Sequence, residues 1–550
     1  MSTINSEKEE KKSLFTHYLA IFVVCFFTFF INNQVIPADL MESRNLATAQ
    51  EMVREGNYLV PTMNGELRLE KPPLPTWIAA GIENIIPGNL VIQRCMAGLS
   101  ATLMVIFLYL FVSRVTRNRN IGLLSSLILA TCFNIVLMGR TATWDIYCHS
   151  FMLGAIYFLF KAFEGSGAQW KNFILAGVFL GLSFLGKGPV SFYAMFLPFL
   201  ISYIAVYRPK MKGKVAPLVA MILLCLIVSL WWMAYIYFFH QDMATAVAQK
   251  ESSSWLNHNV RPWYYYWQFP AEAGIWALFL VTAIVSFFVY KKQEYRKEYK
   301  FALVWFIASL VLLSVIPEKK TRYLLPILIP GAIVTGFYFY HSIKNMATKG
   351  EKVIFRINGA IIALILVALP VVLYIMFYKE NQISAVVLAT ATIFSWGLSA
   401  YIVFSLFGRS GIRPAKVFVG IIASMILVCA VCMIPIGQMF INADRHSIRM
   451  IRENKDVENL PFFYNDSEEL RMELVYEADK TIKPMNLSDD SEIMNNLPFV
   501  LVSGVSIDSI FANKNVEIKK IDTFDNNWRK SGHKRYNWSL VREVAIIKAK

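Results

Sequence analysis

Long runs of apolar residues alternate with short polar segments along most of this chain. Such runs recur from Phe15 to Ile441, and each has the roughly 17–25 residues that a helix needs to cross about 30 Å of hydrocarbon. The pattern predicts about thirteen membrane-spanning helices, which begin near residues 15, 91, 121, 145, 172, 189, 216, 273, 301, 323, 355, 383 and 416. We therefore expect a polytopic α-helical membrane protein.

The last fifth of the chain has a different pattern. Polar residues dominate from residue 442 to residue 550, and no Gly-rich phosphate loop, HExxH or GxSxG motif occurs there. Short apolar stretches predict strands at Leu460–Tyr464, Met472–Tyr476, Phe499–Val502, Val516–Ile521 and Ser539–Ile547. We expect residues 1–441 to form a transmembrane domain and residues 442–550 a small α/β domain that supports the first or docks an acceptor.

Basic residues predict the orientation of the chain. With a cytoplasmic N-terminus, every even-numbered span is followed by a loop rich in Lys and Arg, as the positive-inside rule requires. Two long loops, 34–90 and 240–272, and the C-terminal domain then lie on the extracytoplasmic face. The first apolar run is too long for a signal peptide and lacks a cleavage site, so we expect it to be retained.

Composition agrees with a membrane protein and excludes other classes. Hydrophobic residues make up 56% of the 550 residues and charged residues only 17%. The net charge of +16 comes largely from the short loops and not from a basic face interleaved with aromatics, so nucleic-acid binding is not expected. The seven cysteines lie in or beside apolar runs. Cys429 and Cys432 have CxxC spacing without a second pair, which supports neither a disulfide framework nor a zinc site.

The first long loop carries two carboxylates and an arginine close together in the sequence. Asp39 precedes a segment with helical character over residues 40–54, and Glu42 and Arg44 follow within its first turns. Two roles fit Asp39. It is suited to cap this helix, with Glu42 three residues on in a capping-box arrangement, and it is suited to act as a catalytic carboxylate. The two roles are compatible, because a cap at a bilayer surface still presents its carboxylate.

The same loop contains Glu70 and Lys71 directly before Pro72 and Pro73. Consecutive prolines impose an extended, rigid backbone, so the charged pair points in a fixed direction. A solvated charge pair is one interpretation. The other is a lysine held in place to contact a phosphate.

Seven cations lie outside, or at outer helix ends, against the positive-inside pattern: Arg68, Lys71, Arg140, Lys187, Lys319, Lys320 and Arg322. A single one is explained by snorkelling to lipid phosphates. Several at one depth favour a phosphate-binding site, to which Tyr323 adds a hydroxyl. Asp145, at the outer start of the fourth span, is either an N-cap or a functional carboxylate.

The second long loop contains Glu251, His258 and the aromatic run Pro262–Trp267. A lone histidine is most often structural. The aromatic run fits an interfacial belt or a surface on which a sugar and an isoprenoid stack.

These motifs together resemble the GT-C fold glycosyltransferases, in particular the bacterial aminoarabinose (lipid A) transferases and the related protein O-mannosyltransferases. The resemblance covers residues 15–440 and the thirteen-span count. Its most specific part is Asn64-Gly65 followed by Glu70-Lys71-Pro72-Pro73 and Trp77. Asp145, Lys187, the Glu251–His258 region and Lys320-Thr321-Arg322-Tyr323 follow in the expected order.

The resemblance implies roles for these residues. An acidic residue of the first outer loop is the expected base, with assistance from Asp145, and Arg44, Lys71, Lys187 and Tyr323 are expected to hold the carrier phosphate, with Arg322 beside them. Glu70 and His258 are expected to bind substrate. The family usually has adjacent Asp and Glu before its arginine, whereas Leu40 and Met41 separate Asp39 from Glu42 here. We favour Asp39 over Glu42 as the base.

The expected partners are a polyprenyl-phosphate-linked sugar donor, membrane lipids and an acceptor that is lipid A, a glycan or a protein. The sequence neither requires nor rules out a divalent metal. Two other functions remain open: a same-fold O-glycosyltransferase that acts on protein or envelope glycan, and a lipid or solute transporter. A transporter should show repeat symmetry and midplane charges, whereas the unusual charges here gather at one face.

Overall fold

The computed structural model describes residues 2–243, 245–247, 249, 259–289, 294–438, 442 and 445–550. The chain forms two compact units. The helical unit comprises Met1–Asn33, Glu70–Leu74 and Arg94–Pro435, and the mixed unit comprises Gln34–Leu69, Pro75–Gln93 and Ile436–Lys550. The first long loop therefore belongs mainly to the same unit as the C-terminal segment.

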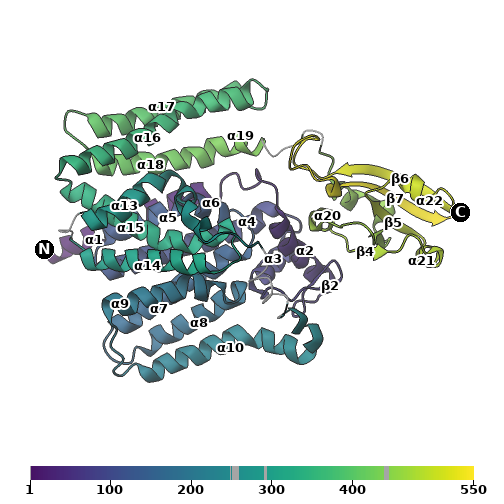
Figure 1. Cartoon of the computed structure of the whole chain (residues 1–550), viewed down its shortest axis with the longest axis horizontal. Coiled ribbons are helices and arrows are strands. Elements are labelled where there is room, and N and C mark those ends of the chain that lie inside the picture. Colours follow the sequence, from purple (N-terminus) through teal and green to yellow (C-terminus); the bar gives the residue numbers. More distant parts are fainter. Residues whose placement is uncertain are drawn as a thin grey trace. The chain divides into compact units, whose positions relative to one another are not determined.

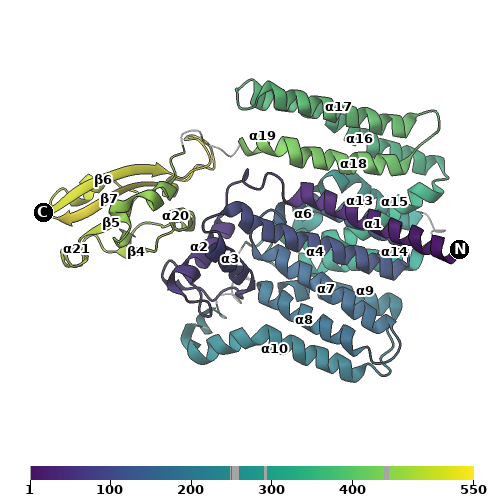
Figure 2. The ribbon, with the colours of Figure 1, turned by 180° about the vertical axis from the view of Figure 1, so that it is seen from behind.

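The helical unit is a bundle whose long helices lie side by side (Figures 1 and 2). In chain order its helices are α1 (Ser2–Phe29), α4 (Leu90–Thr116), α5 (Arg119–Ala130), α6 (Phe133–Met138), α7 (Trp144–Glu164), α8 (Trp170–Lys187), α9 (Leu197–Tyr207), α10 (Val215–Phe239), α12 (Phe269–Ala273), α13 (Ala277–Val289), α14 (Arg296–Val315), α15 (Leu325–Asn345), α16 (Lys349–Leu373), α17 (Ala385–Phe407), α18 (Pro414–Leu427) and α19 (Met433–Gln438).

The predicted polytopic helical membrane protein is confirmed. A helix covers the start of every predicted span or begins a few residues after it. Within the described ranges, nine helices are long and apolar enough to cross a membrane, and three shorter apolar helices accompany them. The count of thirteen crossings stays a prediction.

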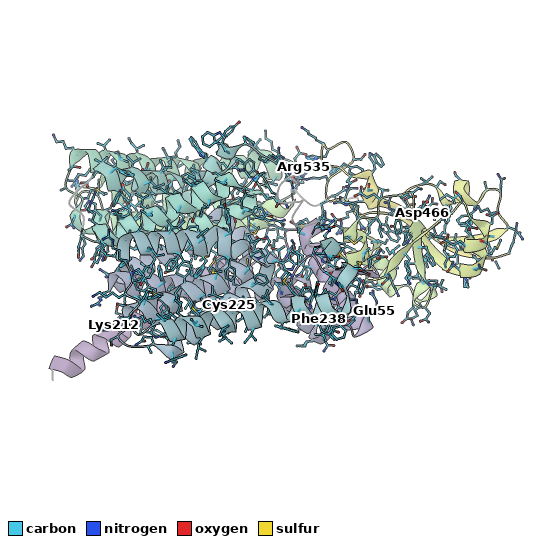
Figure 3. The ribbon with its side chains drawn as sticks, turned by 60° about the horizontal axis from the view of Figure 1, so that its bottom comes forward. Glu55, Lys212, Cys225, Phe238, Asp466 and Arg535 are labelled. Atoms are coloured by element: carbon cyan, nitrogen blue, oxygen red, sulfur yellow. The ribbon has the colours of Figure 1, made fainter. Side chains whose placement is uncertain are left out.

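Burial separates central from peripheral helices of the bundle. The apolar stretch that includes α15 is 94% buried, whereas those of α10 and α17 are only 22% buried. Exposed apolar side chains cover the outside of α10, where Phe238 is 77% exposed. Figure 3 shows Phe238 at one end of this helix and Lys212 beyond the other. α15 therefore forms the core, and the faces of α10 and α17 are suited to contact lipid.

The mixed unit begins with α2 (Leu40–Glu55), the hairpin of β1 (Thr62–Met63) and β2 (Glu66–Leu67), and α3 (Leu74–Ile85). Its C-terminal part is a five-stranded sheet in the order β4-β3-β5-β7-β6. β3 pairs in parallel with β4 and β5, and β7 pairs antiparallel with β5 and β6. The strands are β3 (Phe462–Asn465), β4 (Ile482–Met485), β5 (Phe499–Ser503), β6 (Val516–Asp525) and β7 (Val541–Ala549), with the short helices α20 (Met472–Ala478), α21 (Asp490–Asn496) and α22 (Ile507–Phe511) between them.

The small α/β domain is confirmed, with one wrong strand and one missed strand. Met472–Tyr476 was predicted as a strand but forms most of α20, because its apolar residues pack as one face of a helix against α2. The missed strand is β4, which contains Pro484. Proline is tolerated there because β4 is an edge strand of the sheet.

Candidate functional site

A buried ion pair joins two neighbouring helices of the helical unit. Asp145 lies in the first turn of α7 and Lys187 is the last residue of α8. The Lys187 ammonium donates to Oδ1 of Asp145, and the two side chains are only 6% and 1% exposed. The N-cap of α7 is Thr143, so Asp145 does not cap this helix. Its carboxylate instead compensates a buried cation, which is the usual condition for burying either charge.

Close packing of α7 on α8 brings this pair together. Gly186 lies against Cys148, and a Cβ on this glycine would stand 2.9 Å from the Cys148 Cβ and 3.0 Å from its Cα. The Ser183 hydroxyl donates to the Cys148 carbonyl oxygen at 2.7 Å. The chain then turns at Gly188, whose φ of +73° favours glycine. The sequence Gly186-Lys187-Gly188 thus permits a close helix contact and ends α8 immediately after its lysine.

Three cations surround the ring of Tyr323, at the turn that begins α15. Lys187 Nζ, Lys320 Nζ and Arg322 Cζ lie 5.1, 5.7 and 5.9 Å from the ring centroid. Glu318 accepts from Lys320 at 2.5 Å. The cluster of Asp145, Lys187, Lys320, Arg322 and Tyr323 is called the cation cluster below. With three cations and two carboxylates close by, it has an excess of positive charge.

Two buried polar atoms of the cation cluster face each other without a direct bond. Asp145 Oδ2 and Arg322 Nε are 4.0 Å apart, and neither has a hydrogen-bond partner among the described residues. Burying such groups unpaired is costly. Their arrangement suits a ligand or water that supplies the missing partner.

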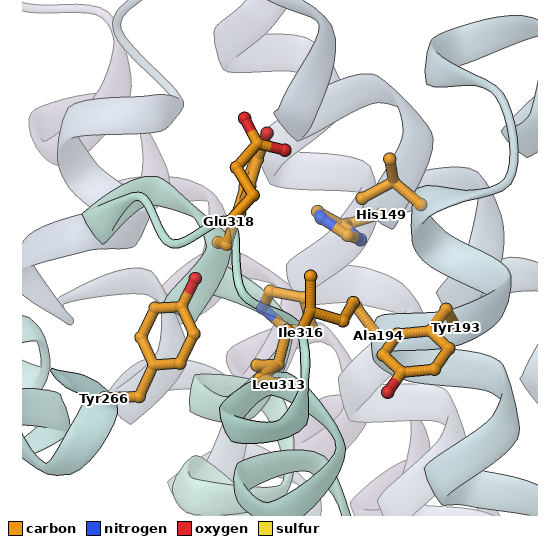
Figure 4. Close-up of a pocket in the computed structure, with 10 residues that line it drawn as sticks. His149, Tyr193, Ala194, Tyr266, Leu313, Ile316 and Glu318 are labelled. Atoms are coloured by element: carbon orange, nitrogen blue, oxygen red, sulfur yellow. The ribbon is translucent and has the colours of Figure 1, made fainter. Parts of the chain in front are cut away.

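A cavity next to the cation cluster has an empty volume of about 490 Å³. Figure 4 shows His149, Tyr193, Tyr266 and Glu318 around it, with Leu313 and Ile316 among its apolar walls. Tyr323 also lines it. Apolar walls with a few polar groups are typical of a small-molecule site.

His149 is one polar residue of this cavity that sequence reasoning missed. It lies one turn after Asp145 on α7, is buried, and its Nδ1 is 3.0 Å from the Ser191 hydroxyl oxygen. The spacing of four residues from Asp145 would have placed it on the same helix face. The aromatic run of the second loop divides: Tyr266 is buried in this cavity, whereas Trp263, Tyr264 and Trp267 are exposed.

The other predicted residues fall in different places. Asp39, Glu42 and Arg44 lie at and in α2 of the mixed unit. Asp39 is the N-cap, as predicted, and its Oδ1 accepts from the Glu42 N–H at 2.8 Å. Glu42 itself is fully buried. Glu70 and Lys71 belong to the helical unit, and His258 and Glu251 lie outside the described residues.

Several of the seven outer cations donate to backbone carbonyl oxygens, as buried Lys319 does to that of Ile316. Arg140 donates to the carbonyl oxygens of Thr28 and Ile31, each at 2.6 Å, and so caps the end of α1. Arg68 donates to the Arg44 carbonyl oxygen at 3.0 Å and fixes the loop to α2. Within the described ranges, no three His, Cys, Asp or Glu side chains gather as a metal site.

The chain is similar in sequence to known glycosyltransferases. Residues 70–232 match the family of dolichyl-phosphate-mannose-protein mannosyltransferases. An uncharacterised protein of Aquifex aeolicus is 27% identical over 62% of this chain and 70% of its own length. The undecaprenyl phosphate-α-4-amino-4-deoxy-L-arabinose arabinosyl transferase 2 of Proteus mirabilis is 26% identical over 73% of this chain and 74% of its own length.

A solved structure shares the fold over nearly the whole chain. ArnT from Cupriavidus metallidurans, crystallised with undecaprenyl phosphate, superimposes with a TM-score of 0.70 at 16% identity, over 97% of this chain and 98% of that one. The chain therefore has the GT-C membrane fold and resembles the aminoarabinose transferases, as its motifs predicted.

Proposed function

We propose that this chain, which has the fold of the aminoarabinose transferases, transfers a sugar from a polyprenyl-phosphate carrier to an acceptor. Its resemblance to those enzymes and to the mannosyltransferase family indicates a glycosyltransferase that depends on a polyprenyl-phosphate-linked sugar. The observation that carries the proposal is the cation cluster, in which buried Lys187 and half-buried Arg322 meet Tyr323 and Asp145.

The reaction is a displacement at the anomeric carbon. The bond from this carbon to the carrier's phosphate oxygen breaks, a bond to the acceptor oxygen forms, and polyprenyl phosphate leaves with the electron pair. Negative charge develops on the departing phosphate, where Lys187, Lys320 and Arg322 stabilise it. The apolar walls of the neighbouring cavity favour an isoprenoid or the hydrophobic face of a sugar.

Asp39 is the base in this proposal. An acceptor hydroxyl must lose its proton, and the Asp39 carboxylate takes it. An acceptor phosphate is already ionised, so the same carboxylate then mainly orients it. Arg44 and Lys71 complete the phosphate contacts, Glu42 supports Asp39, and Glu70 and His258 contact the substrate.

The finer proposal concerns substrates and location. The names of the relatives support an aminopentose donor. The acceptor that we propose is lipid A-like and lies on the periplasmic face of a bacterial inner membrane. The N-terminus is then cytoplasmic and the C-terminal domain periplasmic. A same-fold enzyme that glycosylates protein or another envelope glycan shares the donor chemistry and differs only in its acceptor.

Mass spectrometry of envelope glycoconjugates from cells with and without this chain tests the proposal. Loss of a pentose-like increment on lipid A is the expected result. If lipid A is unchanged and a sugar is missing from protein or polysaccharide, the enzyme is still a glycosyltransferase, but its acceptor is that protein or polysaccharide. Unchanged glycoconjugates of every kind would contradict the proposed transfer.

A further inference from the structure

The hairpin of the first loop meets the edge of the C-terminal sheet through one side chain. The Asn64 amide donates through Nδ2 to the Ile482 carbonyl oxygen, and its Oδ1 accepts from the Ile482 N–H, both at 2.7 Å. Ile482 begins β4, the edge strand of the sheet. The amide therefore satisfies two backbone groups of an edge strand, as a neighbouring strand would.

The same hairpin turn is bound to α2 by a buried carboxylate. Glu51 is 2% exposed, and its two oxygens accept from the N–H groups of Asn64 at 2.7 Å and Gly65 at 2.8 Å. Asn64 and Gly65 have φ values of +60° and +81°, which match the two central residues of a tight hairpin turn. Glu51 thus holds the hairpin turn in place, and the Asn64 side chain of this turn binds β4 of the sheet.

A second contact runs in parallel with the first. Arg54, one turn after Glu51 on α2, donates to the Thr481 hydroxyl at 2.7 Å and pairs with Asp479 at 3.3 Å. Gly65 also approaches the sheet closely, since a Cβ there would stand 3.4 Å from the Thr481 Cγ2. Two adjacent turns of α2 are therefore connected to the segment that leads into β4.

The N-terminal half of α2 is braced within the same unit. The Thr76 hydroxyl donates to Asn45 Oδ1 at 2.7 Å, and Arg68 donates to the Arg44 carbonyl oxygen. Asp39 caps this end of the helix. These bonds hold the N-terminal half of α2 to α3 and to the loop, while a shift of α2 relative to the sheet would break the contacts of Asn64 and Arg54.

We propose that Asn64, held by Glu51, is a positioning residue through which the C-terminal domain sets the placement of α2 and hence of Asp39 and Arg44. This inference rests on the proposed function, because α2 there carries the base and a phosphate ligand. It gives the C-terminal domain an integral part in catalysis, in addition to any acceptor docking. It also explains why an Asn-Gly turn precedes the Glu70-Lys71 pair.

Three variants of the full chain separate the effect of the turn conformation from the effect of the two hydrogen bonds between Asn64 and Ile482. Asn64→Gly keeps the left-handed backbone and removes both hydrogen bonds of the side-chain amide. Asn64→Asp keeps an acceptor for the Ile482 N–H and loses the donor to its carbonyl oxygen. The matched control is Asn381→Gly: Asn381 has φ +55° and its side chain has no hydrogen bond recorded in the described part of the chain.

Hydrogen–deuterium exchange over residues 40–55, in the detergent-purified protein, gives a readout that needs no substrate. Loss of two partly buried hydrogen bonds should speed local exchange in Asn64→Gly by about tenfold or more. Asn64→Asp should fall between Asn64→Gly and wild type, and Asn381→Gly should match wild type. Wild-type exchange in Asn64→Gly would overturn the proposal, whatever the substrate proves to be.

Transfer from undecaprenyl-phosphate-linked 4-amino-4-deoxyarabinose to lipid A then tests the link to catalysis. Asn64→Gly should lower kcat by a larger factor than it raises the KM for the donor. Across the three variants, the loss of kcat should follow the order of their exchange rates. Faster exchange with an unchanged kcat would refute the positioning role. Absence of transfer by wild type itself would count against the proposed substrates and leave the exchange result standing.

Discussion

Asp145 and Lys187 form a buried ion pair although 42 residues separate them in the chain. Each comes from a helix end, and Arg322 lies 4.0 Å from the second carboxylate oxygen of Asp145. A cation this deeply buried needs a counter-charge. The same two residues are therefore expected to govern both the stability of the bundle and the chemistry of its site.

Removing either partner of this pair should destabilise the protein and abolish transfer. Asp145→Asn or Lys187→Met leaves an uncompensated buried charge, which costs about 3–5 kcal/mol. The double variant should recover much of the lost stability without recovering activity. Thermal unfolding in detergent and the transfer rate are the measurements. A double variant with the wild-type rate would show that the pair is purely structural.

Tyr323→Phe should weaken binding of polyprenyl phosphate by about fivefold and leave stability nearly unchanged. The variant keeps the ring that Lys187 contacts at 5.1 Å and loses only the hydroxyl, which is worth about 1 kcal/mol in a polar contact. Product inhibition by polyprenyl phosphate measures the change. Tyr323→Leu, which also removes the ring, should lose more affinity, and equal affinity in both variants would argue against the ring contact.

Asp39→Asn separates capping from catalysis. Asparagine caps a helix as well as aspartate does, so the fold of α2 should persist while the charge is lost. With a hydroxyl acceptor we expect kcat to fall by about 10²–10⁴-fold, and with a phosphate acceptor by much less. Parallel assays of Asp39→Asn with a hydroxyl acceptor and with a phosphate acceptor measure this difference. Glu42→Gln should have the smaller effect, and the reverse order would assign the base to Glu42.

Arg140→Gln should reduce stability without altering carrier affinity. Its guanidinium holds the last carbonyl oxygens of α1, and these buried acceptors would lose their donor at a cost of about 1–3 kcal/mol. Lys71→Ala should instead weaken carrier binding. Thermal unfolding with and without polyprenyl phosphate distinguishes them. Wild-type rates for both Lys71→Ala and Asp145→Asn would refute the proposed site.

Glu83 gives the mixed unit a pH dependence. Burial raises the pKa of its carboxyl, and the hydrogen bond from the Gly88 N–H at 2.8 Å offsets only part of the rise. The folded state therefore binds a proton more tightly than the unfolded chain. This contribution to stability is complete below the ordinary glutamate pKa, about 4.3, and is lost as pH rises through the raised value.

The Glu83→Gln variant isolates this effect. Glutamine keeps the acceptor for Gly88 and cannot ionise, so the difference in melting temperature between variant and wild type should grow in favour of the variant as pH rises from about 4 to 7. Gln93→Ala, which removes the 3.3 Å contact to Glu83 and leaves the carboxyl, should retain the pH dependence. A constant difference across this range would exclude Glu83 as its source.

The sequence by itself determined the elements whose signals are local. Long apolar runs predicted the helices of the bundle, because a helix that meets lipid must be apolar over its length. Asp39 before a helical stretch predicted its cap, since the cap depends only on the next three residues. The strands β3, β5, β6 and β7 followed from short runs of alternating or continuous apolar residues bounded by polar ones.

Tertiary structure decided whatever depends on neighbours that are distant in the chain. The segment that became α20 fits a strand or a helix by pattern, and packing on α2 selects the helix. By its position in the sequence Asp145 is suited to be a helix cap. In the folded chain its carboxylate pairs with Lys187, because Gly186 lets α8 approach α7 closely. Arg140 and Arg68 look like free outer cations until the carbonyl groups that they bind are in place. Asn64 marks a turn in the sequence, and only the folded chain places Ile482 against its amide.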